Sequence, residues 1–524
     1  IAYIPPPSMA INSGDGGLSN AFYSTAEKSI LSYGSSVWYV QNLKSSSDNY
    51  IGFGGSDDVT FVGSSSQETI NLNVNRSSEY SGNLTITMGD GNDSINSAKV
   101  KNTDSIDMGA GDDTVSLMIN GSYGTPTIGA ANFTKLDGGA GTDTLSFEEG
   151  TPDANTELTL TTGGAVNFEN LTGGSNAEVL KGDNNANVLT GKNGADTLYG
   201  YGGNDTLHAD SSGMGNTGSQ TSADVLYGGA GNDTLHGNAG DNTLDGGTGA
   251  DTIYSGGGSD MIILRSGDGG ATKSDGDTIA DFTDGTDSLG LDNSLSFTDL
   301  TIEQSGSDTV IKEGSNYLMT LTGISTSNIS ILDFQSTDSS NQTINGTSGD
   351  DGLVGGAGGD TFNGGAGSDT LLGFAGNDTF NIRSKAGSYA DTVNGGAGTD
   401  TLDINYSGIT SLKDFTLSSS GSNIVLTDAS GGSITFSNIE NLTVNSIAYI
   451  PPPSQAINSG DGGLSNAFYS TAEKSILSYG GAVWYVQNLK SSSDNYIGFG
   501  GSDDVTFVGS SSQETINLNV NRSS

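Results

Sequence analysis

The feature that most constrains this chain is a nine-residue period that runs from residue 176 to residue 264. An acidic or amide residue returns at every ninth position, an aliphatic residue follows two positions later, and glycine-rich turns such as GGAGNDTL at residues 228–235 lie between them. Tandem repetition at a fixed short period indicates a stacked repeat architecture. The period positions are Glu178, Asn187, Asp196, Asp205, Asp224, Asp233, Asn242, Asp251 and Asp260, followed by Leu180, Leu189, Leu198, Leu207, Leu226, Leu235, Leu244, Ile253 and Ile262.

This period predicts a flattened parallel β-roll. Part of each nonapeptide turns and the rest forms a short strand, so two nonapeptides complete one coil. Glycine supplies turn dihedrals that other residues do not reach, and the aliphatic position faces a narrow core. Turns on one edge then lie eighteen residues apart, which should stack Asp233 beneath Asp251 and Asp351 beneath Asp369. We expect an all-β chain of parallel β-roll or β-solenoid modules, with one short helix per repeat unit.

The stacked turns predict calcium sites. Carboxylates and turn carbonyls supply hard oxygen ligands, of which calcium takes about six to eight, and a calcium ion would cancel the repulsion between the carboxylates. Asn187 and Asn242 replace the acid and should weaken their sites, while Met88 and Met108 replace the first glycine of isolated turns. The alternative is that some repeats are turns without metal. The candidate ligands are Asp57, Asp93, Asp113, Asp143, Asp196, Asp205, Asp224, Asp233, Asp251, Asp260, Asp351, Asp360, Asp369, Asp378, Asp391 and Asp400, with the turn glycines Gly229, Gly231, Gly247, Gly249, Gly356, Gly358, Gly365 and Gly367.

The tandem runs closely resemble the RTX family of secreted calcium-binding proteins, both at residues 228–235 and in the second run, GGAGGD at residues 355–360. The resemblance implies a β-roll fold, calcium as the cofactor, and an extracellular or cell-surface protein exported by type I secretion. RTX proteins typically carry a C-terminal export signal; none is recognisable here, and no signal-like segment opens the chain, so we expect an internal fragment. Residues 277–282 resemble the end of the roll in secreted RTX metalloproteases. Asp281, Asp284 and Asp287 there are either ligands of a further cation or a solvated acidic turn.

Composition narrows the class further. The 524 residues include 61 acidic and 17 basic side chains, for a net charge of −44, with 82 glycines and no cysteine. Such a composition alone is typical of disorder, but the period predicts order when a cation is present. The acidity argues against binding a nucleic-acid backbone, and the absence of cysteine excludes disulfides and cysteine-zinc sites. No apolar run reaches the roughly 20 residues of a membrane-spanning helix.

A near-perfect duplication sets the large-scale organisation. Residues 1–78 recur as residues 447–524, with differences only at Met9/Gln455, Ser35/Gly481 and Ser36/Ala482. We therefore expect a tandem array of 446-residue units, which suits a stalk, filament or lattice. The expected segments are a Pro-rich spacer (1–16), a helix cap with a β-solenoid carrying isolated calcium turns (17–173), an RTX β-roll with closing strands (174–336), a second such roll (337–446) and the start of the next unit (447–524).

Local patterns refine these segments. The best helix candidate spans residues 20–33, with a stop at Gly34; it either caps the open end of a roll or docks units together. Residues 37–40 read as a strand. Apolar alternation at residues 168–172 and 436–443 predicts strands that close a roll, and wider turn spacing over residues 50–145 predicts longer coils. Residues 209–222 interrupt the period as a surface excursion.

Nothing in the sequence indicates an enzyme. Zinc-protease, nucleophile-elbow and P-loop motifs are missing, and the carboxylate pairs belong to the nine-residue period. His208 and His236 take the repeat position of Tyr199 and Tyr227, so they are expected to be outward-facing repeat residues. Two interpretations compete: a structural polymer such as a filament, sheath or S-layer-like coat, and the stalk of a giant adhesin. A third is the RTX part of a secreted enzyme or toxin. The expected partners are other copies of the chain and, as a second candidate, a cell-surface polysaccharide.

Overall fold

The computed structural model describes residues 83–99, 102–118, 133–147, 156–210, 221–292, 295–383, 385–420 and 423–449, with short strands and single positions on either side of them. The described elements are β-strands and short 3-10 turns. The chain divides into two compact units: Ile1–Ser288 with Ile302–Asn328, and Leu289–Thr301 with Ile329–Ser524. Within the described residues, no helix is both long enough and apolar enough to span a membrane.

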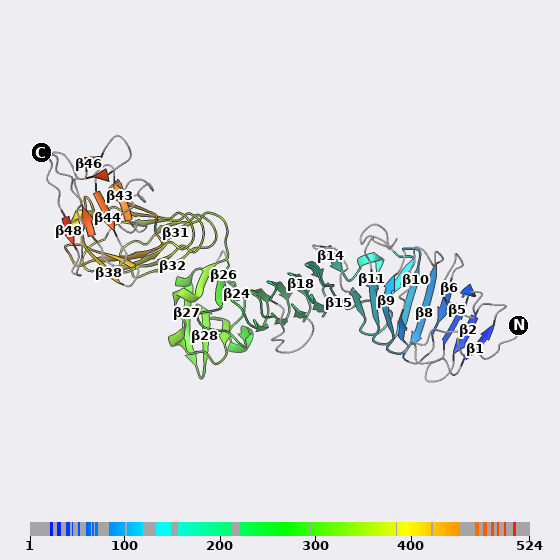
Figure 1. The fold of residues 1–524 in the computed structure, drawn as a ribbon. Coiled ribbons are helices and arrows are strands. Elements are labelled where there is room, and N and C mark those ends of the chain that lie inside the picture. The colour runs from blue at the N-terminus through cyan, green and yellow to red at the C-terminus, as the bar shows by residue number, and fades with distance from the viewer. Residues whose placement is uncertain are drawn as a thin grey trace. The chain divides into compact units, whose positions relative to one another are not determined.

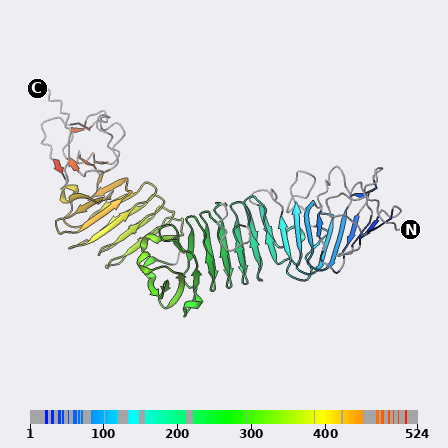
Figure 2. The same cartoon turned by 60° about the horizontal axis from the view of Figure 1, so that its bottom comes forward.

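The first unit contains a parallel β-roll whose strands alternate between two faces (Figures 1 and 2). One face is built from two sheets. The first contains β6 (Val59–Val62), β8 (Leu84–Asp90), β10 (Ser105–Ala110) and β12 (Lys135–Asp137), and the second contains β14 (Thr156–Thr159), β16 (Glu178–Lys181), β18 (Thr197–Gly202), β20 (Val225–Ala230), β22 (Thr243–Thr248) and β24 (Met261–Leu264). Asp137 of β12 forms an isolated parallel bridge with Val166. The other face holds β7 (Thr69–Asn71), β9 (Ser94–Lys99), β11 (Thr114–Met118), β13 (Thr144–Phe147), β15 (Asn170–Thr172), β17 (Val188–Thr190), β19 (Thr206–His208), β21 (Thr234–His236), β23 (Thr252–Tyr254) and β25 (Asp277–Ile279).

The strand register confirms two nonapeptides per coil. Thr234 in β21 pairs with Thr252 in β23, eighteen residues later. The longer coils expected earlier in the chain are also present, because Ser105 pairs with Thr85 on one side and with Lys135 on the other, at spacings of 20 and 30 residues. Across the interruption of the period at residues 209–222, β18 pairs with β20 at a spacing of 28 residues instead of 18. This segment therefore adds ten residues to a single coil. Residues 211–220 themselves lie outside the described part.

The aliphatic positions of the period form the core. Each is fully buried, and Met88 and Met108 are buried as well, so the two methionines add to the core where a turn glycine is replaced. Burying a side chain of this size contributes about 1.5–3 kcal/mol. The roll is stabilised by these two files of side chains, one from each face, together with its strand ladders. The fully buried set is Leu180, Leu189, Leu198, Leu207, Leu226, Leu235, Leu244, Ile253 and Ile262.

The helix expected at residues 20–33 is wrong. The segment forms an antiparallel hairpin of β1 (Ala21–Ser24) and β2 (Ser29–Ser32), and β2 pairs with β3 (Trp38–Gln41), which confirms the strand expected near residue 38. An isolated helix of this length is marginal in water, whereas aromatic and β-branched residues favour strands. Pairing of β3 with β6 adds the hairpin to the edge of the first face. The second sequence copy repeats it as β43 (Ala467–Ser470), β44 (Ser475–Ser478) and β45 (Trp484–Val486).

One of the two expected closing segments is also wrong. Residues 168–172 include β15, which pairs with both β13 and β17, so the roll continues without interruption across residue 173. The alternation there arises because Glu169, Asn170 and Leu171 repeat the acid–x–aliphatic pattern of an internal coil. The first roll ends later, where β25 pairs with β29 (Asn316–Leu321) and β29 turns antiparallel to β28 (Asp308–Glu313), which neighbours β27 (Leu300–Ser305).

The second unit contains a shorter roll of the same kind. Phe362 and Phe380 stack in its core with ring centroids 4.7 Å apart. The segment at residues 436–443 does close this roll, because β40 and β41 each carry an antiparallel partner, β39 and β42. One sheet orders β31 (Thr343–Asn345), β33 (Thr361–Asn363), β35 (Thr379–Ile382), β37 (Thr401–Ile404), β41 (Asn441–Val444) and β42 (Ile447–Tyr449); the other orders β32 (Gly352–Val354), β34 (Thr370–Leu372), β36 (Ala390–Asn394), β40 (Ser433–Ser437), β39 (Asn423–Thr427) and β38 (Thr416–Ser420).

The last strand of this sheet belongs to the second sequence copy. β42 consists of the first three residues of that copy, and it pairs antiparallel with β41, placing Tyr449 opposite Leu442. Tyr449 is fully buried in the core of the second roll, and its hydroxyl accepts a hydrogen bond from the Leu412 N–H at 3.4 Å. The second roll is therefore completed by residues of the duplicated segment.

Replacing Tyr449 with alanine should loosen the end of the second roll. Truncation of a buried aromatic side chain costs about 3–5 kcal/mol, so amides of β37 and β41 should exchange faster in hydrogen-exchange mass spectrometry of the recombinant 524-residue chain. Tyr3→Ala is the matched control, because Tyr3 is the same residue of the first copy and follows no roll in that chain. Equal acceleration in the two variants would contradict this role for β42.

Candidate metal-binding turns

The acidic period residues form a hydrogen-bonded ladder along each edge of the first roll. Each precedes a strand, and its Oδ1 accepts the backbone N–H of the period residue one coil earlier. Thus Asp251 accepts from Asp233 at 2.7 Å, and Asp233 accepts from Asp205 at 2.7 Å. The expected stacking of Asp233 on Asp251 is confirmed. The same contact links Glu178 to Asp196, Asp196 to Asp224, Asp224 to Asn242, Asn242 to Asp260 and Asn187 to Asp205.

The isolated turns and the second roll use the same contact. Asp93 donates to Asp113 at 2.6 Å and Asp113 to Asp143 at 2.8 Å, although these turns lie 20 and 30 residues apart. In the second roll, Asp351 donates to Asp369 at 3.2 Å, as expected. Asp57 lies outside the described residues. The other contacts of the second roll join Asp360 to Asp378, Asp369 to Asp391 and Asp378 to Asp400.

Sequence reasoning missed several ladder members. Asp251 donates to Asp277, Asp143 to Glu169 and Asp400 to Glu440. These acids, Asp277, Glu169 and Glu440, lack the full glycine-rich turn but keep the acid–x–aliphatic pattern, as do Asp104 and Asp287. The acid–x–aliphatic pattern therefore predicts the ladder residues better than the full glycine-rich turn does.

The acidic segment after β25 is a capping network. Asp287 is 5 % exposed; its Oδ1 accepts from the Asp260 N–H and its Oδ2 from the Thr283 N–H at 2.7 Å. Asp281 accepts hydrogen bonds from the backbone of Ser255 and Gly256. Asp284 is exposed and accepts one from Asn328. Asp287 is thus a buried ladder member, and the segment as a whole is not simply a solvated turn.

The second carboxylate oxygen separates the turns into two groups. In the first group, that oxygen is buried and meets no hydrogen-bond partner among the described residues. In the second group it is satisfied: Asp351 accepts from the Thr347 N–H at 2.6 Å, and Asp360 from the Gly356 N–H at 3.1 Å. A buried unsatisfied charged oxygen costs about 1–3 kcal/mol or more, so the first group fits a cation. It includes Asp113, Asp143, Glu178, Asp196, Asp205, Asp233, Asp251, Asp260, Asp378, Asp391 and Asp400.

The first glycine of each turn keeps the space beside this oxygen open. A Cβ at Gly228 would lie 2.5 Å from Asp233 Oδ2 and 2.5 Å from the Gly246 carbonyl oxygen of the next coil. A carboxylate and a backbone carbonyl thus line one small space, which is the hard-oxygen chemistry of calcium. No three His, Cys, Asp or Glu side chains converge in the described part of the chain, so backbone carbonyls would have to supply most ligands.

The later turn glycines are required by conformation and by packing. Gly229 and Gly231 have φ values of 111° and 139°, and a Cβ on Gly231 would lie 1.5 Å from the Gly203 carbonyl oxygen of the preceding turn. Gly247, Gly249, Gly365 and Gly367 share the positive φ, whereas Gly356 and Gly358 are confined by the carbonyl oxygens of Asp338 and Ser340.

The two asparagine turns differ in their contacts from the aspartate turns. Asn242 keeps the ladder contact, since its Oδ1 accepts from Asp224 at 3.0 Å. Its Nδ2 donates to the Gly240 carbonyl at 2.8 Å, so an amide nitrogen stands in for the second oxygen. Asn187 likewise donates through Nδ2 to the Glu169 carbonyl at 2.8 Å. The side chains of Asn187 and Asn242 carry no charge, and their amide nitrogens are already hydrogen-bonded.

Burial makes the ladder carboxylates hard to ionise without a cation. It raises the pKa of Asp196 to about 8, and the charges of Glu178 and Asp224 add to the shift. Burial likewise raises the pKa of Asp260 and of Asp378 to about 7. The metal-free rolls therefore carry charge that either protons or a cation must neutralise.

The metal-free chain should gain β-structure as the pH falls from 8 to 5. Folded-state pKa values above the ordinary value of 3.8 mean that the folded chain holds protons that the unfolded chain releases. This stabilisation is full below about pH 4 and is lost as pH rises through about 7 to 8. Circular dichroism of metal-depleted protein measures it, and a β-signal that grows toward pH 8 would contradict it. Asp196→Asn keeps the amide-accepting oxygen and should raise metal-free stability at pH 8 but not at pH 5.

Comparison with known proteins agrees with this geometry. The family model described as RTX calcium-binding nonapeptide repeat (4 copies) matches residues 172–211, 221–253, 236–269, 336–371, 354–381 and 384–403. No curated protein matches the chain. Similar solved structures include the AlgE6R3 subunit of the Azotobacter vinelandii mannuronan C5-epimerase (18 % identity, 36 % of this chain and 82 % of that one, TM-score 0.14) and the extracellular lipase LipA of Serratia marcescens (14 %, 57 % and 43 %, TM-score 0.13). Similarity at these TM-scores carries no conclusion about function. The two tandem runs of this chain are RTX calcium-binding nonapeptide repeats.

Proposed function

We propose that this chain is a calcium-dependent, extracellular structural protein whose 446-residue units are joined in tandem in a filament, sheath or S-layer-like assembly on a bacterial cell. The single observation that carries the tandem arrangement is the recurrence of residues 1–78 as residues 447–524, and β42 of the second copy pairs with β41 of the preceding roll. The second copy and the preceding roll therefore share a sheet, not only a linker.

The calcium requirement follows from the orphaned carboxylate oxygens. Bound calcium would supply positive charge beside them, and the residues that would hold it are the ladder acids with the carbonyls of the glycine turns. Because the ladders run along both edges of each roll, filling them would stabilise successive coils together. Cytosolic calcium is too low to fill sites of the extracellular class, with dissociation constants of roughly 0.1–1 mM. The chain would therefore leave the cell unfolded and fold outside.

The histidines support a structural and non-catalytic role. His208 stacks on His236 at 4.7 Å, and His236 on Tyr254 at 4.8 Å, with nearly parallel rings. Burial lowers the pKa of His208 to about 4, so the ring is neutral near pH 7. The stack continues the repeat across neighbouring strands, as does the stack of Tyr199 on Tyr227 at 4.9 Å. Tyr201 is 47 % exposed beside Tyr199, and a cell-surface polysaccharide is the partner we propose for this aromatic strip.

Folding of the recombinant chain should depend on calcium. At about ten times the dissociation constant each site adds about 1.4 kcal/mol, so about eight independent sites would add on the order of 11 kcal/mol, as much as a whole domain's stability. Circular dichroism at pH 7.5 should show a strong β-signal in millimolar calcium and its loss in excess chelator. An unchanged signal in chelator would contradict the proposal.

The two groups of turns should respond differently to neutralisation. Asp233→Asn removes an orphaned oxygen and should cost one calcium ion, whereas Asp351→Asn alters an oxygen already bonded to the Thr347 N–H and should cost less. Both variants keep the ladder, because asparagine at position 233 retains the Oδ1 that accepts from Asp205, and position 351 donates to Asp369 through its backbone N–H. Calorimetric calcium titration measures the difference, and equal losses would show that oxygen satisfaction does not rank the sites.

A further inference from the structure

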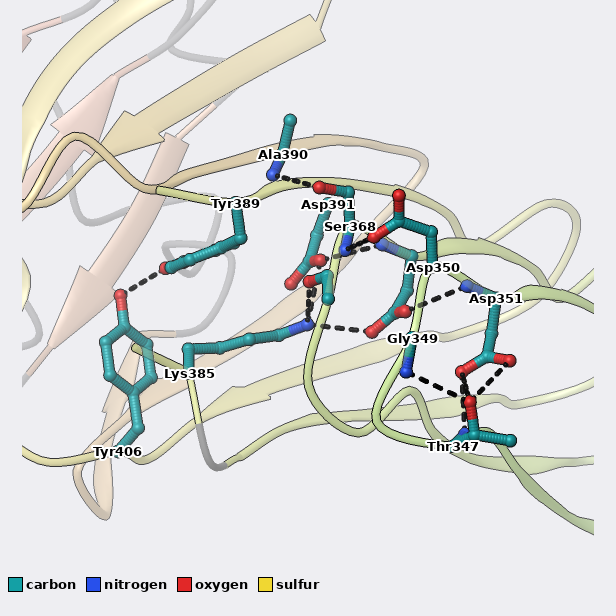
Figure 3. A network of polar contacts seen from close by, with 12 residues as sticks. Thr347, Gly349, Asp350, Asp351, Ser368, Lys385, Tyr389, Ala390, Asp391 and Tyr406 are labelled. Atoms are coloured by element: carbon teal, nitrogen blue, oxygen red, sulfur yellow. Dashed lines mark hydrogen bonds and ion pairs between the residues drawn. The ribbon is translucent and has the colours of Figure 1, made fainter. Parts of the chain in front are cut away.

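One pair of stacked acids in the second roll already holds a cation. The ammonium of Lys385 lies between Asp369 and Asp391, with Nζ 2.7 Å from Asp369 Oδ2 and 2.9 Å from Asp391 Oδ1. It also donates to the Gly367 carbonyl oxygen at 2.9 Å. Figure 3 shows the Lys385 chain extended into the turn toward Asp391, with Tyr389 on its flank. The Lys385 side chain is 1 % exposed and both carboxylates are fully buried.

These three contacts use every donor that an ammonium has. Their acceptors are two stacked carboxylates and the carbonyl of a turn glycine, which is the same kind of oxygen set that lines the other turns. A buried ammonium is costly unless it is fully paired, and here it is. The Tyr389 ring, 5.3 Å from Nζ, adds a cation–π contact and hydrogen-bonds through its hydroxyl to Tyr406 (Figure 3).

The opposite edge of the same coil provides an internal comparison. Asp378 and Asp400 are also 22 residues apart and make the same ladder contact at 2.8 Å. Their second oxygens meet no partner among the described residues. Both ladders span the one coil that is four residues longer than the eighteen-residue repeat, since Thr370 pairs with Thr392. The added length falls between β35 and β36, where Lys385 lies.

We propose that Lys385 is a built-in cation that occupies the calcium position between Asp369 and Asp391, so that this turn is independent of calcium and becomes a calcium site only when the ammonium is removed. The inference rests on the proposed calcium function of the other turns. In the second roll, the ladder contact between Asp369 and Asp391, beside β34 and β36, then persists when calcium is removed.

Native mass spectrometry of the recombinant 524-residue chain in calcium tests this. Lys385→Met keeps the length of the side chain without its charge and should bind one more calcium ion than the wild type. Lys413→Met, an exposed lysine of the same roll, should leave the count unchanged. In excess chelator, Lys385→Met should lose hydrogen-exchange protection at Asp369 and Ala390, and Lys413→Met should not. An unchanged calcium count in Lys385→Met would overturn the inference.

A second pair of variants does not require Lys385→Met to fold. Asp369→Asn alters the second oxygen that Lys385 already satisfies and should leave the calcium count of the chain unchanged, whereas Asp378→Asn, on the opposite edge of the same coil, should lower it by one. Loss of an ion from Asp369→Asn would overturn the inference while leaving the proposed function intact. A wild-type chain that binds no calcium would overturn the proposed function itself, and this inference with it.

Discussion

The contact on which both rolls depend is the hydrogen bond from the backbone N–H of one acidic residue to the Oδ1 of the acidic residue a coil later. It satisfies an amide where strand pairing has not yet begun, and it sets the register of each coil on the next. Because it uses only one oxygen, it leaves the second oxygen of Asp233 or Asp251 buried beside a turn glycine. The same contact that aligns the coils therefore concentrates negative charge at about the strand spacing of 4.8 Å.

The negative charge is compensated differently at different turns of the two rolls. At Asn187 and Asn242 the charge is absent, and at Asp351 and Asp360 an amide of the same turn satisfies the second oxygen. Between Asp369 and Asp391 a lysine ammonium fills the space. Turns such as those of Asp196, Asp233 and Asp378 keep a buried second oxygen with no hydrogen-bond partner among the described residues, which a proton or a metal cation would satisfy. The need for a cation is thus a property of particular turns and is unevenly distributed along the described part of the chain.

The connection between units follows from an unpaired edge. A parallel roll ends in a strand whose outer backbone groups require a partner. β41 obtains one from the first three residues of the following sequence copy, and Tyr449 fills the core beneath it. The hairpin of β43 and β44 that comes next repeats that of β1 and β2.

Much of this architecture could be predicted from the sequence, because the nine-residue period specifies strand, turn and core positions locally. From Leu180 to Ile262, each aliphatic residue that lies two positions after the acidic or amide residue of the period is fully buried. The isolated turns, the longer coils and the stacking of Asp233 on Asp251 follow from the same pattern. Outside the period, the helix prediction failed although the strand near residue 38 was confirmed. The apolar spacing of residues 20–33 fits a helix, but pairing with β3 made the segment a hairpin. What only the tertiary structure decided is which oxygens are already satisfied, because Lys385 reaches Asp369 and Asp391 from a loop, and Tyr449 reaches the core from the next copy, through contacts that no local pattern encodes.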